Sequence, residues 1–185
     1  MIFITSDLHF FHDKEFIYKP RGFNSEQEMR EYYIKIWNEK ITNEDDIYIL
    51  GDFCLGQDFI AIKNLILSLN GKIHLIHGNH DTDKKLELYK TLENIVEVVP
   101  VKDRFRYKDY RFYLSHYPTI TSNLETNPKN CVFNLYGHIH ENKKFYEERP
   151  YMMNVSMDAQ DNKILCIEEV ISQIEGKIEE CLSYL

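Results

Sequence analysis

The sequence is poor in the residues that build extended or cross-linked proteins. It contains 7 glycines, 5 prolines and 4 cysteines in 185 residues, which excludes collagen-like, low-complexity and disulfide-dense architectures. The cysteines form no CxxC pair, so we expect reduced thiols with structural roles; they are Cys54, Cys131, Cys166 and Cys181. The length and composition favour a single domain over residues 1–185.

Long hydrophobic runs are also missing. No stretch approaches the about 20 apolar residues that a membrane helix needs. The first residues, MIFITSD, lack the basic start and the long apolar run of a secretion signal. We therefore expect a cytoplasmic protein without a membrane partner.

Positively charged residues are outnumbered as well. The chain has 22 Lys and Arg and 30 Asp and Glu, which gives a formal net charge of −8. This balance argues against an extended nucleic-acid-binding surface.

Short apolar runs and helical spacings predict an alternation of strands and helices. The predicted strands are residues 1–5, 47–50, 73–76, 95–99, 112–114, 132–136 and 152–155. The predicted helices run from a capping box at Ser25 to Lys40, from Phe59 to Leu69, from about Asp83 to Lys90, and from Ile167 to Leu182. Alternating aromatic and charged residues over 104–114 predict an antiparallel hairpin. Residues 117–130 are the only long irregular stretch, and the whole pattern predicts a layered α/β sandwich.

Asp, His, Asn and Gly residues gather directly after the predicted strands. The blocks are Asp7-x-His9, Gly51-Asp52, Gly78-Asn79-His80-Asp81, Ser115-His116 and Gly137-His138-x-His140. In open α/β sheets, ligands bind in the crevice beyond the carboxyl ends of the strands. Each block alone is typical of a turn or a surface loop. Their occurrence together, in this order, indicates one shared site.

The ordered series resembles the calcineurin-like metallophosphoesterases, whose blocks are D-x-H, G-D, G-N-H-D, H and G-H-x-H. The resemblance runs from Ile2 to about Asp158. It implies the fold of that family, a layered α/β/β/α sandwich with two mixed β-sheets. The chain also resembles a small, capless bacterial and phage branch of the family. In that branch the first block continues into a segment that here runs from His12 to Arg21 and Phe23.

The resemblance implies a centre of two divalent metal ions, for which imidazole and oxygen ligands suit Mn, Fe, Zn or Ni. The implied ligands of the first ion are Asp7, His9, Asp52 and His140, and those of the second are Asp52, Asn79, His116 and His138. Asp52 would bridge the two. The implied reaction is in-line attack on phosphorus by a hydroxide held between the ions. His80 would protonate the leaving oxygen or stabilise the transition state, and Asp81 would orient it.

Several further polar residues need a separate interpretation. His12 and Arg21 are candidate substrate contacts, since Arg binds phosphate oxygens through two parallel hydrogen bonds; the alternative for both is an ordinary surface role. His74 and His77 flank a predicted core strand and are interpreted as structural. Residues 154–158, Asn-Val-Ser-Met-Asp, resemble the segment that supports the active site in this family.

Departures from the family pattern narrow the expected function. Gly51-Asp52 lacks the Asp-Arg-Gly continuation of the protein Ser/Thr phosphatases, and Asp instead of Glu follows His80. We therefore expect a phosphodiesterase that acts on a small or nucleotide-type phosphate ester. The alternatives are a compact nuclease or cyclic-nucleotide phosphodiesterase, and a non-catalytic interaction scaffold. The presence of His80 and of all seven ligand side chains argues against the scaffold.

Overall fold

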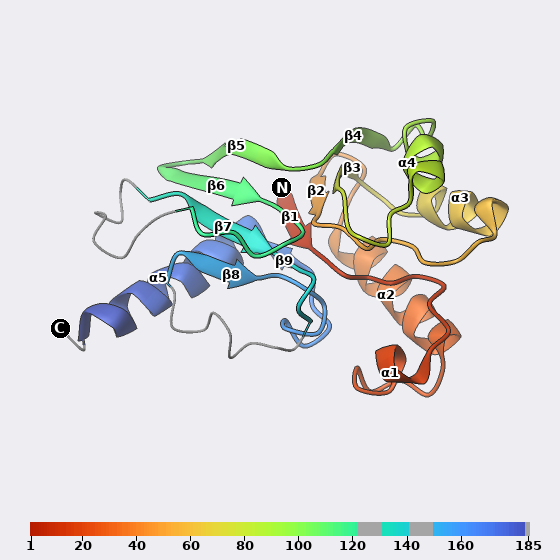
Figure 1. The fold of residues 1–185 in the computed structure, drawn as a ribbon, viewed down its shortest axis with the longest axis horizontal. Coiled ribbons are helices and arrows are strands. Elements are labelled where there is room, and N and C mark those ends of the chain that lie inside the picture. The colour runs from red at the N-terminus through yellow and green to blue at the C-terminus, as the bar shows by residue number, and fades with distance from the viewer. Residues whose placement is uncertain (122–130, 141–149, 184–185) are drawn as a thin grey trace.

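The computed structural model describes residues 1–121, 131–140 and 150–183, with nine strands in that part of the chain (Figure 1). Five belong to the first sheet: β1 (Ile2–Thr5), β2 (Asp46–Ile49), β3 (Lys72–Ile76), β4 (Ile95–Val99) and β9 (Leu165–Cys166). Four belong to the second: β5 (Lys102–Tyr107), β6 (Tyr110–Leu114), β7 (Phe133–Tyr136) and β8 (Met152–Asn154).

Both sheets are mixed, as the resemblance implied. The first has the order β4-β3-β2-β1-β9, with β1 to β4 parallel and β9 antiparallel to β1. The second has the order β5-β6-β7-β8; β5 and β6 form the predicted antiparallel hairpin, and β6, β7 and β8 run parallel. Parallel strands require crossovers, so the carboxyl ends of several strands meet at one edge of each sheet.

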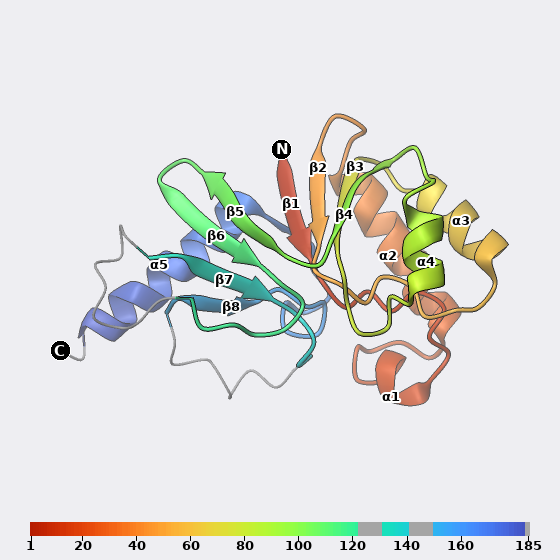
Figure 2. The ribbon, with the colours of Figure 1, turned by 45° about the horizontal axis from the view of Figure 1, so that its top comes forward.

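Helices cover the two sheets on opposite sides (Figures 1 and 2). They are α1 (Glu15–Tyr18), α2 (Glu26–Lys40), α3 (Phe59–Leu67), α4 (Asp83–Tyr89) and α5 (Ile167–Ser183). The predicted cap of α2 is present, because the Ser25 side chain accepts a hydrogen bond from the Glu28 amide at 3.1 Å. Helices α2 to α4 lie against the first sheet and α5 lies along the second, which confirms the α/β/β/α layering. Among the described residues, no helix is both long and apolar enough to span a membrane.

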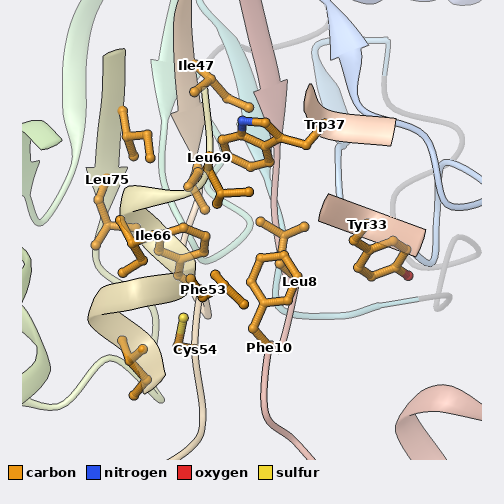
Figure 3. Packing of buried hydrophobic residues seen from close by; sticks show 14 of the residues in the cluster. Leu8, Phe10, Tyr33, Trp37, Ile47, Phe53, Cys54, Ile66, Leu69 and Leu75 are labelled. Carbon is orange, nitrogen blue, oxygen red and sulfur yellow. The ribbon is translucent and has the colours of Figure 1, made fainter. Parts of the chain in front are cut away.

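Alternation along the central strands divides the hydrophobic core into two clusters. In β2 the side chains of Ile47 and Ile49 face the helices α2 to α4, while Tyr48 faces the second sheet. The helix-side cluster contains Trp37 and Phe53, which are fully buried (Figure 3). A sheet that buries both faces is held rigidly, and its strand ends therefore make a fixed platform.

The loops that follow the strands stay paired beyond the sheets. The Asp7 amide donates to the Gly51 carbonyl at 3.1 Å, and the His9 amide donates to the Asp52 carbonyl at 3.0 Å. A bridge between Ser6 and Ser156 joins the end of β1 to the segment after β8. Loops from both sheets thus converge at one place.

Candidate metal centre

A first group of donors converges beside the end of β1. Nε2 of His9 lies 3.7 Å from Oδ1 of Asp7 and 3.8 Å from Oδ2 of Asp52. Nε2 of His140 lies 3.9 Å from the same oxygen of Asp7. Ligands that share one cation at 2.0–2.2 Å lie about 3–3.5 Å apart, so only a small contraction would bring these atoms into one coordination shell.

The buried donors of this group lack partners within the protein. Oδ1 of Asp7 and both ring nitrogens of His9 are buried without a hydrogen bond, although buried polar atoms are nearly always satisfied. Burial opposes ionisation of Asp7, yet the neighbouring imidazoles keep the pKa of its carboxyl below the usual value. Burial likewise lowers the pKa of His9. An ionised carboxylate beside a neutral imidazole is the state that binds a metal ion, so the residues fit one.

A second group of donors is still closer together. Oδ1 of Asn79 lies 2.8 Å from Nε2 of His116 and 2.9 Å from Nδ1 of His138. The two ring nitrogens are 3.2 Å apart. These three separations match donors on one face of a coordination shell.

The hydrogen bonds of His116 show why this second group fits a cation. Its Nδ1 lies 2.8 Å from the Leu50 carbonyl oxygen, which can only accept, so Nδ1 carries the proton. In the neutral ring, Nε2 then presents a lone pair to Oδ1 of Asn79, another acceptor, at 2.8 Å. Two lone pairs so close together repel each other unless a positive charge lies between them, and a metal ion would supply that charge.

Asp52 connects the two groups. Its Oδ2 lies 3.8 Å from Nε2 of His9 and 3.7 Å from Nε2 of His116, and the side chain is 2% exposed. The seven predicted ligands are thus brought together, with Asp52 between them as expected for a bridging carboxylate. The acids and imidazoles of the described residues include two sets that could each hold an ion: Asp7, His9 and the half-buried His140, and Asp7, Asp52 and His116.

The ligand loops adopt backbone conformations that non-glycine residues usually avoid. Five of the predicted ligands have positive φ between 49° and 68°: Asp7, His9, Asp52, His138 and His140. Asp and His tolerate this region better than most residues, but each instance costs free energy and clusters of this kind occur at functional sites. The backbone is therefore strained at the positions that direct these side chains toward one another.

The glycines of the blocks are needed because the loops touch. A Cβ atom on Gly78 would lie 2.2 Å from the amide nitrogen and from Oδ1 of Asp52. A Cβ atom on Gly137 would lie 2.0 Å from Oγ of Ser6 and 2.2 Å from Oδ2 of Asp7. A side chain at either position would displace a ligand.

The Asp81 carboxylate bonds to backbone amides, whereas the sequence predicted that it would orient His80. Its carboxylate accepts hydrogen bonds from the amides of Asp52 at 2.8 Å, Gly78 at 2.9 Å and Phe53 at 3.3 Å. Burial raises the pKa of Asp81 to about 6, although these amides favour the ionised form. Asp81 therefore ties the loop after β2 to the loop after β3. We find no hydrogen bond from it to the imidazole of His80 among the described residues.

Arg21 is a structural residue and not a substrate contact, which corrects the expectation from the sequence. Its guanidinium is 1% exposed and donates to both carboxylate oxygens of Asp158, at 2.9 and 2.6 Å. It also donates to the carbonyls of Asp7 at 2.8 Å and Leu8 at 3.2 Å. A buried group with all its donors engaged has none left for a phosphate.

The pair of Arg21 and Asp158 also orients His140, one of the predicted metal ligands. Nδ1 of His140 donates to Oδ2 of Asp158 at 2.8 Å, so in the neutral ring Nε2 carries the lone pair, and it faces Asp7. Burial opposes ionisation of Asp158, but His140 and Arg21 hold its pKa far below the usual value. Asn154 adds a hydrogen bond to the His140 carbonyl at 2.7 Å. The segment 154–158 thus has the supporting position that its sequence suggested.

We predict that Arg21→Ala weakens metal binding about 10- to 100-fold and destabilises the fold by about 3–5 kcal/mol. Loss of a supporting partner usually weakens a metal site by that factor, and Asp158 would stay buried without its counter-charge. Metal titration and thermal unfolding measure the two effects. Arg104→Ala, which removes a 91% exposed guanidinium, is the control. A raised KM with unchanged metal affinity would contradict the structural role.

His80 and His12 lie on the open side of the centre. The His80 side chain is 48% exposed, and its Nε2 lies 3.9 Å from Oδ2 of Asp52. The ring of His12 lies 5.4 Å from that of His9 and 6.3 Å from that of His80, between centroids. Both imidazoles therefore lie beside the donor groups without belonging to them.

Of the two histidines outside the blocks, His74 has the structural role that its position indicated. His74 pairs with Asp46 at 2.8 Å and Glu97 at 3.3 Å on the strands beside it. The His77 amide donates to the Val99 carbonyl at 3.0 Å, while its Nε2 is buried without a hydrogen-bond partner, so a structural role for this side chain stays a prediction.

The structure adds a supporting residue that the sequence did not reveal. Lys85 on α4 is buried, and its Nζ donates to the carbonyls of Cys54 at 2.7 Å and His80 at 3.2 Å. The His80 amide in turn donates to Oδ1 of Asp52 at 2.8 Å. The backbone of His80 is therefore held on both sides, and its ring is left to solvent. From the sequence alone, a lysine on an amphipathic helix would be predicted to lie on the surface.

Comparison with known proteins supports the class that this fold and donor set define, a metal-dependent phosphoesterase. The model of the calcineurin-like phosphoesterase superfamily domain matches residues 1–157, and the chain belongs to this superfamily. MJ1445, an uncharacterised protein of Methanocaldococcus jannaschii, is 30% identical over 192 residues, covering 100% of this chain and 97% of that protein. A crystal structure of AQ665, a protein of unknown function from Aquifex aeolicus, is similar with a TM-score of 0.72. It is 26% identical and covers 93% of this chain and 98% of that one.

Proposed function

We propose that the protein is a phosphodiesterase that uses two divalent metal ions, with manganese the first to test. The observation that carries this proposal is the pair of donor groups joined by Asp52, the first with buried donor atoms that lack a hydrogen-bond partner and the second with three donor atoms within 3.2 Å of one another. One ion would be held by Asp7, His9, Asp52 and His140, and the other by Asp52, Asn79, His116 and His138. Ions bound there would supply hydroxide near neutral pH and neutralise charge on the phosphoryl oxygens.

The protein's own residues would fix the geometry of the reaction. Asp52 would set the separation of the two ions, because its buried carboxylate reaches both groups. Asp81 would keep that separation constant by tying the Asp52 loop to Gly78 through backbone amides. Preorganised ligands avoid rearrangement during the reaction, which lowers its barrier.

His80 is the group proposed to move a proton. Its backbone is anchored to Asp52 and Lys85, so the exposed ring occupies a defined place over the centre. A protonated His80 would donate from its ring to the leaving oxygen as the ester bond breaks. His12 lies against His9 and within reach of His80, and we propose that it contacts the substrate on the same side.

A panel of four substrates tests the proposed function. Manganese-reconstituted protein would be assayed on bis-p-nitrophenyl phosphate, p-nitrophenyl phosphate, 2′,3′-cyclic nucleotides and single-stranded DNA. We expect the small diester or the cyclic nucleotides to be hydrolysed fastest, because the net charge of −8 disfavours a long polyanion. Fastest cleavage of DNA would support a nuclease. No turnover of any ester with Mn, Fe, Zn or Ni would refute the proposal.

A further inference from the structure

Tyr117 presents an exposed aromatic ring directly on the second group of ligands. Its ring centroid lies 4.5 Å from that of His138 and 5.1 Å from that of His116. The residue is nevertheless 52% exposed. One part of the ring therefore contacts the ligands while the remainder faces solvent beside the centre.

The backbone that carries this ring is firmly held. The Tyr117 carbonyl accepts hydrogen bonds from Oγ of Ser115 at 2.7 Å and from Oγ1 of Thr119 at 3.1 Å. Asn134, which is fully buried in β7, accepts from the Thr119 amide at 2.7 Å and donates to Oγ of Ser115 at 2.9 Å. A buried amide thus fixes the turn that displays Tyr117. A ring on a fixed backbone loses less conformational freedom when a ligand stacks on it than a ring on a mobile loop.

The position of Tyr117 relative to His80 suggests which part of a substrate it meets. The His80 ring lies near His9, 5.8 Å between centroids, and thus near the first group of ligands. Tyr117 lies against the second group. If the leaving group departs beside His80, the ester that stays on phosphorus is the one that extends toward Tyr117.

We propose that Tyr117 determines specificity by stacking on a nucleobase carried by the ester that remains on phosphorus. The inference rests on the proposed phosphodiesterase function and assigns its substrate class, a nucleoside phosphodiester. Base–aromatic stacking tolerates every base, because each has a flat π-face. One ring beside one reaction centre, on a chain with net charge −8, suits a mononucleotide unit and not a long strand.

Two diesters with the same leaving group test the proposal. Thymidine 5′-(p-nitrophenyl phosphate) and methyl p-nitrophenyl phosphate both release p-nitrophenol and differ only in the retained ester. We expect the wild-type protein to prefer the thymidine ester in kcat/KM. Tyr117→Leu should reduce that preference by about 5- to 150-fold, the range of one base–aromatic stack. Tyr117→Phe keeps the ring and should preserve the preference within about twofold.

Tyr32→Leu is the matched control. Tyr32 is 42% exposed, but its ring packs on Phe23 and Tyr33, with centroids 5.3 and 6.0 Å away. This variant should leave both substrates unaffected. An unchanged preference in Tyr117→Leu would overturn the proposal. An equal loss on both esters would also overturn it, because Tyr117 would then act by supporting His138.

A binding measurement keeps this test separate from the proposed activity. Calorimetry would compare thymidine 5′-monophosphate with methyl phosphate, the products of the two esters, on manganese-loaded protein. We expect the nucleotide to bind at least about fivefold tighter, and Tyr117→Leu to remove the difference. Equal affinities in the wild-type protein would overturn the role of Tyr117. Failure to hydrolyse either ester, with the nucleotide preference present, would instead refute the phosphodiesterase function alone.

Discussion

Asp52→Ala should lose both metal ions and at least about 10³-fold in turnover, more than loss of any one histidine ligand. A bridging carboxylate serves both ions, and each ion contributes several kcal/mol to stabilising charge in the transition state. The geometry supports this, since Oδ2 of Asp52 lies within 3.8 Å of donors from both groups. Elemental analysis after reconstitution gives the ion count, and His116→Ala provides the comparison.

A second variant separates the loss of a ligand from the loss of the loop. Oδ1 of Asp52 also accepts the His80 amide at 2.8 Å, so Asp52→Ala removes an anchor of the catalytic loop as well. Asp52→Asn keeps an acceptor there and removes the charge. We expect it to fold with an unchanged melting temperature while still binding less than two ions. Two ions per chain in both variants would show that Asp52 is not the bridge.

His80→Asn should keep the fold and both ions while turnover falls about 10²- to 10⁴-fold, the usual contribution of a positioned acid–base group. Its ring is 48% exposed and lies 3.9 Å from the nearest carboxylate oxygen of Asp52, so removing it costs little stability. The backbone anchors to Asp52 and Lys85 remain in the variant. His74→Asn, a change at a histidine remote from the ligands, is the control for activity.

The dependence on the leaving group identifies what His80 does. If it protonates the leaving oxygen, the loss should shrink for p-nitrophenyl esters, which need little protonation, and grow for alkyl esters. A uniform loss would instead indicate that His80 stabilises charge in the transition state. Wild-type turnover of all substrates by His80→Asn would refute any catalytic role.

The fold was largely predictable because its elements have clear periodicity and caps. Helix α2 begins at the predicted Ser25 cap, and the hairpin of β5 and β6 turns at Lys108, which has the left-handed φ of 50°. Helix α1 has four residues and β9 has two, too few for a periodic pattern, and neither was predicted. The predicted irregular stretch 117–130 is described only as far as residue 121.

The convergence of the predicted ligands could be expected from the sequence for a different reason. Each ligand directly follows a strand, and the carboxyl ends of parallel strands meet at one edge of a sheet. Cys54, Cys131 and Cys166 form no disulfide among the described residues; the side chain of Cys181 lies outside them.

The roles of the supporting residues could not be predicted, because they depend on contacts between distant segments. Arg21 is bound by Asp158, 137 positions away, and nothing near it in the sequence distinguishes a buried pair from an exposed phosphate contact. The Asp81 carboxylate accepts hydrogen bonds from backbone amides of the Asp52 loop. These bonds form because the two loops lie close together, which the sequence does not show. Tyr117 follows a ligand in sequence, but only the buried Asn134 shows that its turn is fixed.

As proposed, two ions joined by Asp52 would make this chain a phosphodiesterase. Metal-free protein would be titrated with Mn²⁺, and bound metal and hydrolysis of bis-p-nitrophenyl phosphate would be measured in the same samples. We predict that activity rises until two ions are bound per chain and then stays constant. Full activity at one bound ion, or activity that does not depend on metal, would contradict the account.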